Sequence, residues 1–194
     1  MTETMPNAAM PDDLSSAVEA ARHGDETAFR QLYRAIQPGL LRYLQVLVGG
    51  DAEDVASETW LHVVRDLRTF KGDGMGFRRW AVTIGRHRAL DHLRRHQRRP
   101  VVAIPVEALV DLPGTEDTAT SAMQTISTDA ALSMIASLPP DQAEAVLLRV
   151  VIGLDAESAA QVLGKRSGAV RTAAYRGLRR LNETFSRTPG ENGE

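Results

Sequence analysis

Residues 156–181 read AESAAQVLGKRSGAVRTAAYRGLRRL, and this stretch decides how the end of the chain folds. Its spacing fits a helix, a short turn and a second helix. Ala160 is small enough to lie where the helices cross, Gly164 suits a left-handed turn position, and Ser167 can cap the second helix. An ordinary helical hairpin has the same outline. The side chains on the surface of the second helix therefore have to distinguish an ordinary hairpin from a helix-turn-helix that binds nucleic acid.

At about 100° per residue, Val170, Ala174, Gly177 and Leu181 fall on one side of this second helix. The other side carries three arginines and no acid, whereas a merely solvated helix would normally mix signs. We therefore favour DNA recognition over a solvated face, because short and basic side chains meet base edges and phosphates. The candidate DNA-binding residues of the turn and this face are Lys165, Arg166, Ser167, Gly168, Arg171, Thr172, Tyr175, Arg176 and Arg179.

Charge is partitioned along the chain, although its 194 residues have a net charge of only -2. Residues 77–99 contain eight arginines against the single acid Asp91, and residues 164–180 contain six basic residues and no acid. Acidic segments at 1–26 and 100–130 offset them. Two basic blocks on either side of a linker favour one long polyanion as the partner.

The apolar spacing predicts an all-α protein with two small helical domains joined by a flexible acidic linker. Residues 1–13 form a leader, residues 14–99 the first domain and residues 100–128 the linker, which contains three prolines and no sustained periodicity. Residues 129–185 form the second domain, in which Pro139 and Pro140 precede a helix, and residues 186–194 form a tail.

Within the first domain, Gly49 and Gly50 end one helix and Asp51 caps the next. The apolar stripe predicted to face the core of that next helix comprises Ala52, Val55, Ala56, Thr59, Trp60, Val63, Val64 and Leu67. Residues 71–76 (KGDGMG) form a loop, and the helical pattern restarts at Phe77.

The helix from Phe77 has a basic side as well as a buried one. Phe77, Trp80, Ala81 and Ile84 face the core, and Asp91 is placed to pair with Arg88 and Arg95. Arg79, Arg86, His87, Leu90 and Arg94 share an arc that suits phosphates or single-stranded bases. Taken alone, this arc fits a solvated helix equally well.

The sequence offers no catalytic constellation, cofactor motif or metal site, so we expect no enzyme. His92 and His96 lie one turn apart near His87, but Asp91 is the only nearby third ligand and arginines surround it. Glu58 and His62 are four residues apart, whereas a di-iron bundle needs three. With no cysteine, no signal peptide and no membrane-length apolar run, the expected location is the cytoplasm, without membrane insertion.

Three motifs together resemble a known family. Residues 51–60 (DAEDVASETW), residues 80–95 (WAVTIGRHRALDHLRR) and Leu138-Pro139-Pro140 with the helix-turn-helix resemble the extracytoplasmic-function (ECF) sigma factors of bacterial RNA polymerase. The resemblance implies a promoter-specificity subunit whose second domain reads the minus-thirty-five element. It also implies two partners, namely core RNA polymerase (the clamp helices and the flap) and promoter DNA, and it leaves open whether an anti-sigma factor is a third.

By position, the resemblance implies that residues 51–65 bind the polymerase clamp helices, that residues 70–75 capture a flipped base, and that residues 77–95 melt and recognise the minus-ten element. The implied polymerase-binding residues are Asp51, Glu53, Asp54, Glu58, His62 and Arg65. The implied minus-ten residues are Phe70, Lys71, Arg79, Arg86, His87 and Arg94.

A free-standing helix-turn-helix regulator that binds its operator as a dimer is the alternative from another functional class. The acidic first turn and apolar stripe of the helix from Asp51, together with the long acidic linker, favour the sigma-factor interpretation.

Overall fold

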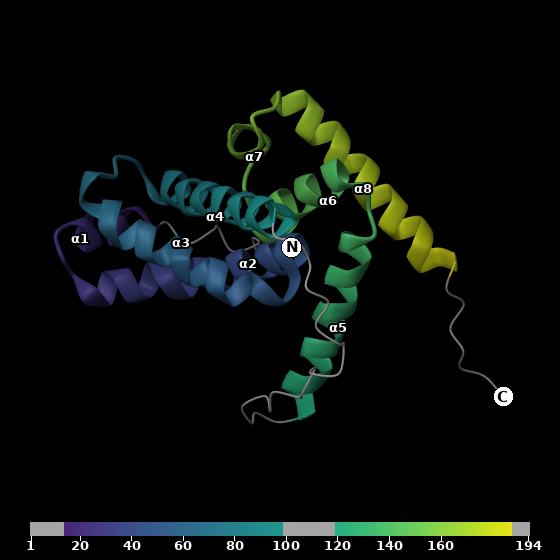
Figure 1. Cartoon of the computed structure of the whole chain (residues 1–194), viewed down its shortest axis with the longest axis horizontal. Helices are drawn as coiled ribbons and strands as arrows, with labels where there is room; N and C mark the ends of the chain where they lie inside the picture. Colours follow the sequence, from purple (N-terminus) through teal and green to yellow (C-terminus); the bar gives the residue numbers. More distant parts are fainter. Residues whose placement is uncertain (1–13, 99–118, 188–194) are drawn as a thin grey trace, which may run out of the picture.

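The computed structural model describes residues 14–98 and 119–187, and within these ranges the chain is helical and contains no strand (Figure 1). The predicted all-α class is confirmed. The expected leader 1–13, residues 99–118 of the expected linker and residues 188–194 of the tail lie outside the described residues. None of the described helices is long and apolar enough to cross a membrane.

The first domain is built around the long helix α2 (Glu26–Val48), against which α1 (Ser15–Arg22) packs. Asp25 caps α2 by accepting hydrogen bonds from the backbone N–H groups of Thr27 and Ala28 at 2.8 and 3.0 Å. Gly49 ends α2 with a φ of 62°, as its sequence position predicts. The buried stripe of α2 consists of Ala28, Leu32, Ile36, Leu40, Tyr43 and Leu44.

The short 3₁₀ turn η1 (Gly49–Asp51) leads into α3 (Ala52–Asp66), which continues as the turn η2 (Leu67–Thr69). Most of the predicted stripe is buried, and the Trp60 indole N–H donates to Gln37 Oε1 at 2.6 Å. Two expectations are wrong. Val64 is 54% exposed, and the Asp51 side chain makes no capping hydrogen bond to α3.

Helix α4 (Gly74–Arg98) begins three residues before the expected restart at Phe77, so the predicted loop 71–76 is shorter than expected. Asp73 Oδ1 accepts a hydrogen bond from the Gly76 backbone N–H at 2.7 Å, and the Gly74 N–H donates to Ser15 Oγ at 3.0 Å. These contacts satisfy backbone N–H groups in the first turn of α4. The glycines of this segment predict a loop, because the sequence does not show that Ser15 and Asp73 accept these hydrogen bonds.

The second domain comprises α5 (Ala119–Ala136), α6 (Pro140–Val146), the π-helical segment η3 (Leu147–Val151), α7 (Ala156–Leu163) and α8 (Ser167–Arg187). Helix α5 covers residues 119–128 of the expected linker. Pro140 is the first residue of α6, as predicted. Gly177 lets α8 lie close to α6, because a Cβ there would sit 2.7 Å from Val146 Cγ2.

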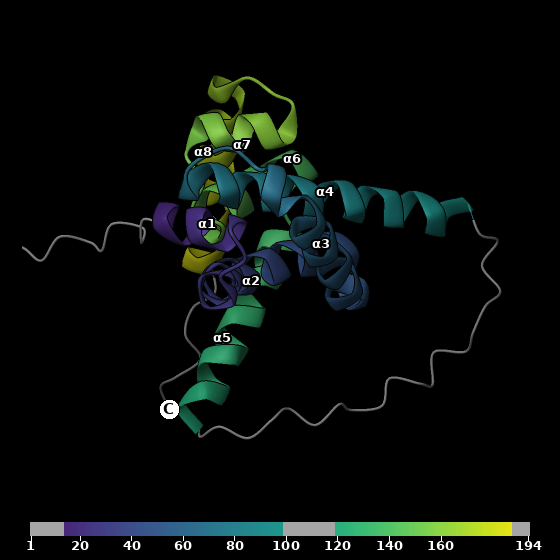
Figure 2. The same ribbon diagram turned by 90° about the vertical axis from the view of Figure 1, so that its left-hand side faces the viewer.

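The two domains pack against each other. Helix α7 lies above α4, while α5 and η3 contact α2 (Figures 1 and 2). A Cβ on Gly39 would lie 3.3 Å from the Val151 carbonyl oxygen, so this glycine permits close approach of α2 and η3. The C-terminal turns of α4 extend beyond this contact, beside α3 (Figure 2).

Candidate nucleic-acid and protein interfaces

Helices α7 and α8 form the helix-turn-helix predicted from the sequence. Asp155 caps α7 by accepting a hydrogen bond from the Ser158 backbone N–H at 2.7 Å, and this bond lowers the pKa of the Asp155 carboxyl. Gly164 has the left-handed conformation, with a φ of 63°, and the Lys165 N–H donates to the Ala160 carbonyl oxygen at 3.0 Å. Ser167 is the first residue of α8 rather than its cap.

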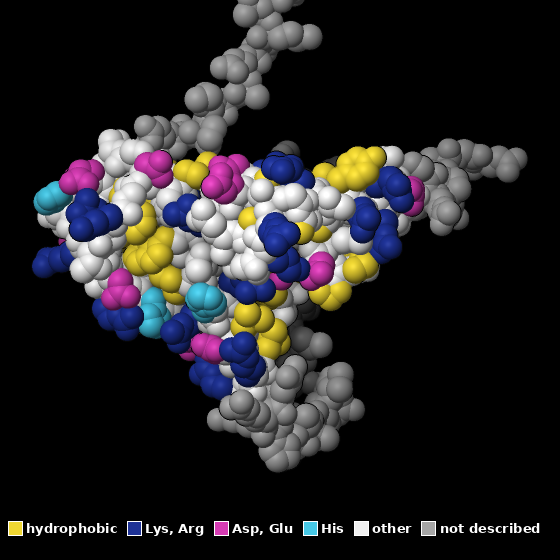
Figure 3. Space-filling view, turned by 90° about the horizontal axis from the view of Figure 1, so that it is seen from above, with side chains coloured by type: hydrophobic (Ala, Val, Ile, Leu, Met, Phe, Trp, Pro, Cys, Tyr) yellow, Lys and Arg dark blue, Asp and Glu magenta, His cyan; other side chains and the backbone are white. Residues whose placement is uncertain are grey.

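The predicted recognition face of α8 is exposed, and the opposite stripe is buried. Val170 and Ala174 are 1% and 6% exposed, whereas the Tyr175 ring is 66% exposed. In Figure 3, Lys and Arg side chains are spread over the visible face, and one group of them lies at the right, where α8 runs. The exposed candidates are Lys165, Arg166, Gly168, Arg171, Thr172, Tyr175, Arg176 and Arg179, and Ser167 is partly exposed.

Some of these groups have protein partners. Lys165 Nζ lies 2.7 Å from Asp141 Oδ1, and Arg179 Nε lies 3.3 Å from Glu183 Oε1. Thr172 Oγ1 donates to the Gly168 carbonyl oxygen at 3.0 Å. All these ion pairs are exposed and therefore contribute little to folding, so their cations stay available for an anion from outside.

The predicted basic arc of α4 is divided between solvent and the second domain. His87 and Arg94 are exposed, although Arg94 lies 3.1 Å from Asp91. Arg86 instead turns toward α6, where its Nε and Nη2 donate to the two carboxylate oxygens of Glu144 at 3.0 and 3.3 Å. The spacing of α4 could not reveal this partner, which lies 58 residues away in sequence.

A partly buried cluster joins Arg86 and Glu144 to the buried Tyr43 of α2. The Tyr43 hydroxyl donates to Glu144 Oε1 at 3.1 Å, and the Tyr43 side chain has no exposed surface. Burial, followed by the charge of Glu144, raises the pKa of Tyr43 well above its ordinary value. Burial is the largest single influence on Arg86 and lowers its pKa, but the hydrogen bond and charge of Glu144, together with the contributions of Tyr43, outweigh it and leave the pKa raised.

The segment expected to capture a flipped base is anchored by its aromatic residue. Phe70 stacks on Trp80 with ring centroids 4.9 Å apart and meets Phe77 edge-on at 5.5 Å. Lys71 is exposed and Arg79 is partly exposed. One groove runs between this segment and α7, and its lining comprises Gly72, Asp73, Met75, Gly76, Arg79, Asp155, Glu157, Ser158 and Gln161.

The outer side of α3 combines charged and apolar groups. The expected polymerase-binding residues Asp51, Glu53, Asp54, Glu58 and Arg65 are exposed, and His62 is partly buried, with its Nδ1 2.8 Å from Arg65 Nη2. Two apolar residues of this side, Leu61 and Val64, are 71% and 54% exposed. The predicted polymerase-binding residues included neither of them. Leu61 lies out of phase with the buried stripe, which is the sequence signal that could have identified it.

The sequence of the chain matches those of known protein families and of individual proteins. Models of Sigma-70 region 2 and Sigma-70, region 4 match residues 32–99 and 128–181. The ECF RNA polymerase sigma factor ShbA of Streptomyces griseus subsp. griseus is 34% identical over 190 residues, which cover 89% of this chain and 97% of ShbA. The chain belongs to the ECF sigma factors of the sigma-70 family.

Other relatives agree with this membership. The ECF RNA polymerase sigma factor BldN of Streptomyces coelicolor is 35% identical over 167 residues, which cover 84% of this chain but only 62% of BldN. The fold matches CnrH in complex with the cytosolic domain of CnrY, with a TM-score of 0.61, 20% identity and coverage of 90% of this chain and 97% of that chain. RpoE of Bartonella quintana, in complex with the anti-sigma factor NepR, matches with a TM-score of 0.60, 22% identity and coverage of 83% and 98%.

The buried phenol of Tyr43 makes stability depend on alkaline pH. Its pKa is raised above the ordinary 10.0, so its stabilising contribution is complete below pH 10 and is lost as pH rises through the folded value. While only the unfolded phenol ionises, each pH unit costs about 1.4 kcal/mol of unfolding free energy. Tyr43→Phe should remove this component of the slope in urea unfolding measured between pH 8 and pH 11. Parallel pH profiles for the two proteins would contradict the assignment.

Proposed function

We propose that this protein is a promoter-specificity subunit of bacterial RNA polymerase that acts in the cytoplasm and has no catalytic activity of its own. It directs core polymerase to promoters by recognising minus-thirty-five and minus-ten elements and promoting DNA melting. The observation that carries the proposal is the outer side of α3, where exposed Leu61 and Val64 lie among exposed charges. An apolar patch with a charged rim fits a protein partner, which a free-standing regulator would not need there.

The exposed face of α8 is the proposed reader of duplex DNA. Arg171, Thr172 and Tyr175 lie near its N-terminal part and face away from the core, where they can approach base edges. Arg176 and Arg179 continue the same face and suit phosphates. This surface stays exposed while the two domains are packed together.

The proposed minus-ten surface on α4 is only partly accessible in the packed arrangement. Arg86 is held by Glu144, and the groove at Gly72 and Arg79 is walled on its other side by Asp155 and Glu157 of the second domain. These carboxylates lie where phosphates of a bound strand would have to come. Melting therefore requires the second domain to move away from α4. An anti-sigma factor is a further proposed partner, one that could act by opposing this movement.

The docking proposal predicts that Leu61→Ala weakens binding to core polymerase. Leu61 is 71% exposed, so its loss should leave the domain folded while removing a contact of about 1–3 kcal/mol. Charge reversal at Asp54 and Glu58 should weaken the same complex. Leu178→Ala is the matched control, since Leu178 is also exposed but lies on α8. Co-elution of all variants with core polymerase at wild-type strength would favour the free-standing regulator instead.

The duplex-reading proposal separates Arg171 from Arg179. Arg171→Ala should cost about 1–3 kcal/mol chiefly at one position of the minus-thirty-five element, because it removes a base contact. Arg179→Ala should weaken binding to all duplexes and lower the salt slope by about 1, because it removes a phosphate contact. Fluorescence anisotropy with an intact and a scrambled element measures both effects. Equal losses on the two duplexes for both variants would exclude a reading role for Arg171.

The proposed movement of the second domain away from α4 can be tested at Glu144. Glu144→Gln removes the charge that holds Arg86, so single-stranded non-template minus-ten DNA should bind the free protein more tightly, by about 1–2 kcal/mol or roughly 5- to 30-fold. Asp129→Asn, which removes an exposed charge of the same domain, controls for net charge. Arg86→Ala in the Glu144→Gln background should abolish the gain. Unchanged affinity of Glu144→Gln would show that the packed arrangement does not restrict α4.

A further inference from the structure

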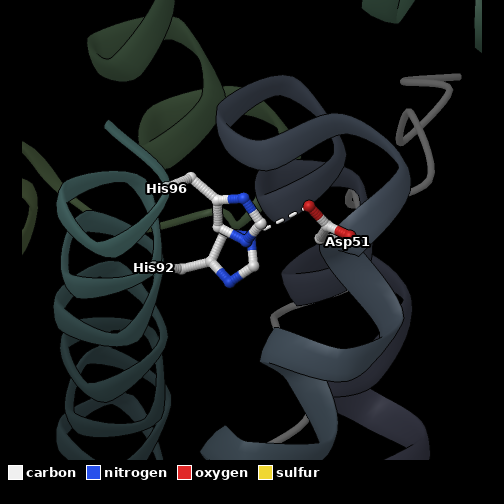
Figure 4. Close-up of side chains that lie close together, drawn as sticks. All are labelled: Asp51, His92 and His96. Carbon is white, nitrogen blue, oxygen red and sulfur yellow. Dashed lines mark hydrogen bonds and ion pairs between the residues drawn. The ribbon is translucent and has the colours of Figure 1, made fainter. Parts of the chain in front are cut away.

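Two histidines near the end of α4 face the start of α3 (Figure 4). His92 and His96 are one helical turn apart, and their ring centroids are separated by 4.2 Å. Asp51 brings a carboxylate from η1, with its Oδ2 2.9 Å from His92 Nε2. One potential ligand atom from each of the three residues lies within 4.8 Å of the others. The cluster thus joins two elements that are distant in sequence.

The Asp51 carboxylate is directed to this cluster instead of to its own helix. Asp51 immediately precedes α3, where an aspartate usually accepts hydrogen bonds from the first backbone N–H groups. Its side chain makes no such bond, and its Oδ2 contacts His92. Asp91, which sequence spacing offers as the third ligand, instead pairs with Arg94 at 3.1 Å, and not with Arg88 and Arg95 as expected.

Two arginines near this end of α4, Arg94 and Arg95, each lie beside a carboxylate. Besides the Arg94–Asp91 pair, Arg95 Nη2 lies 3.9 Å from Glu58 Oε2 of α3. With Asp51, three carboxylates therefore stand against Arg94, Arg95 and Arg88, the last of which lies one turn before His92. The repulsion that an arginine-rich segment would exert on a cation is offset locally.

We propose that Asp51, His92 and His96 bind one divalent transition-metal ion of the zinc, cobalt or nickel class. Imidazole and carboxylate are the ligands that such ions accept, and three protein ligands leave a position for water. Tetrahedral ligands about 2.0–2.2 Å from an ion are about 3.3–3.6 Å apart, so the Asp51 Oδ2–His92 Nε2 distance of 2.9 Å has to widen slightly when the ion replaces their hydrogen bond. The three ligand atoms already lie within 4.8 Å of one another, so side-chain rotations, including that of the exposed His96 ring, bring them into range.

The ion would link the beginning of α3 to the last turns of α4. Those turns extend beyond the packed part of the domain (Figure 2), so a bridge to η1 would restrain them. An ion that binds the folded form and not the unfolded one raises the melting temperature with its concentration. The bridge is distinct from the proposed DNA and polymerase contacts, except that it shares Asp51.

The test is zinc titration of the full-length chain by calorimetry, with a melting curve for each variant. The expected result is one ion per chain, a melting temperature that rises with zinc, and an affinity at least about tenfold lower for Asp51→Asn, His92→Ala or His96→Ala. His87→Ala is the matched control, because His87 is exposed on the same helix outside the cluster. It should bind zinc as the wild type does.

Three outcomes would overturn the site. One is the absence of zinc binding at micromolar concentrations, which would reduce the cluster to an ion pair. Another is undiminished binding by Asp51→Asn and His96→Ala, which would place the ion elsewhere. The third is loss of binding with His87→Ala. Circular dichroism of the zinc-free variants distinguishes ligand loss from unfolding, and the exposed positions of Asp51 and His96 make those two variants decisive.

Discussion

The arrangement of the two domains depends on the partly buried contact of Glu144 with Arg86 and Tyr43. A partly buried ion pair adds little net stability, because desolvation offsets most of its attraction, but it penalises any other packed arrangement that leaves one of its charges unpaired. Glu144 meets both partners at 3.0–3.1 Å, one on α4 and one on α2. Nearby, Arg78 Nη1 donates to the Ile152 carbonyl oxygen at 3.1 Å. Directional contacts of this kind determine which faces meet and still allow the domains to separate.

This contact gives the two basic surfaces different accessibility. The face of α8 remains exposed with the domains packed, whereas Arg86 of α4 is occupied by Glu144. Under the proposed function, duplex recognition can therefore precede domain separation. Strand capture cannot, because α7 borders the groove at Gly72 and Arg79. Duplex recognition by α8 is therefore the first step and strand capture by α4 the second, because the α8 face is exposed while the domains are packed and Arg86 of α4 is held by Glu144.

Local sequence patterns predicted the helices and their ends well. They predicted less well which residues at the border of a buried stripe are exposed. Gly49 and Gly164 have the positive φ angles expected at helix ends, and the two sides of α8 lie as its periodicity predicts. Val64 was assigned to the core because two adjacent apolar residues fit the same stripe, yet only Val63 is buried. The partner of Arg86 was invisible for another reason. Helical spacing reports neighbours within one or two turns, and Glu144 comes from the other domain.

Helix α4 shows how far such contacts can be separated along one element. Its first turns meet Phe70 and the groove beside α7, its middle holds Arg86 against Glu144, and its end places two histidines beside Asp51. A helix advances about 1.5 Å per residue, so Arg79, Arg86 and His92 are roughly 9–11 Å apart along the axis. Changes at sites that far apart usually add independently. Strand binding and domain closure are nevertheless coupled because both use Arg86 and the start of α4, whereas the proposed bridge at the end of the helix can be adjusted separately.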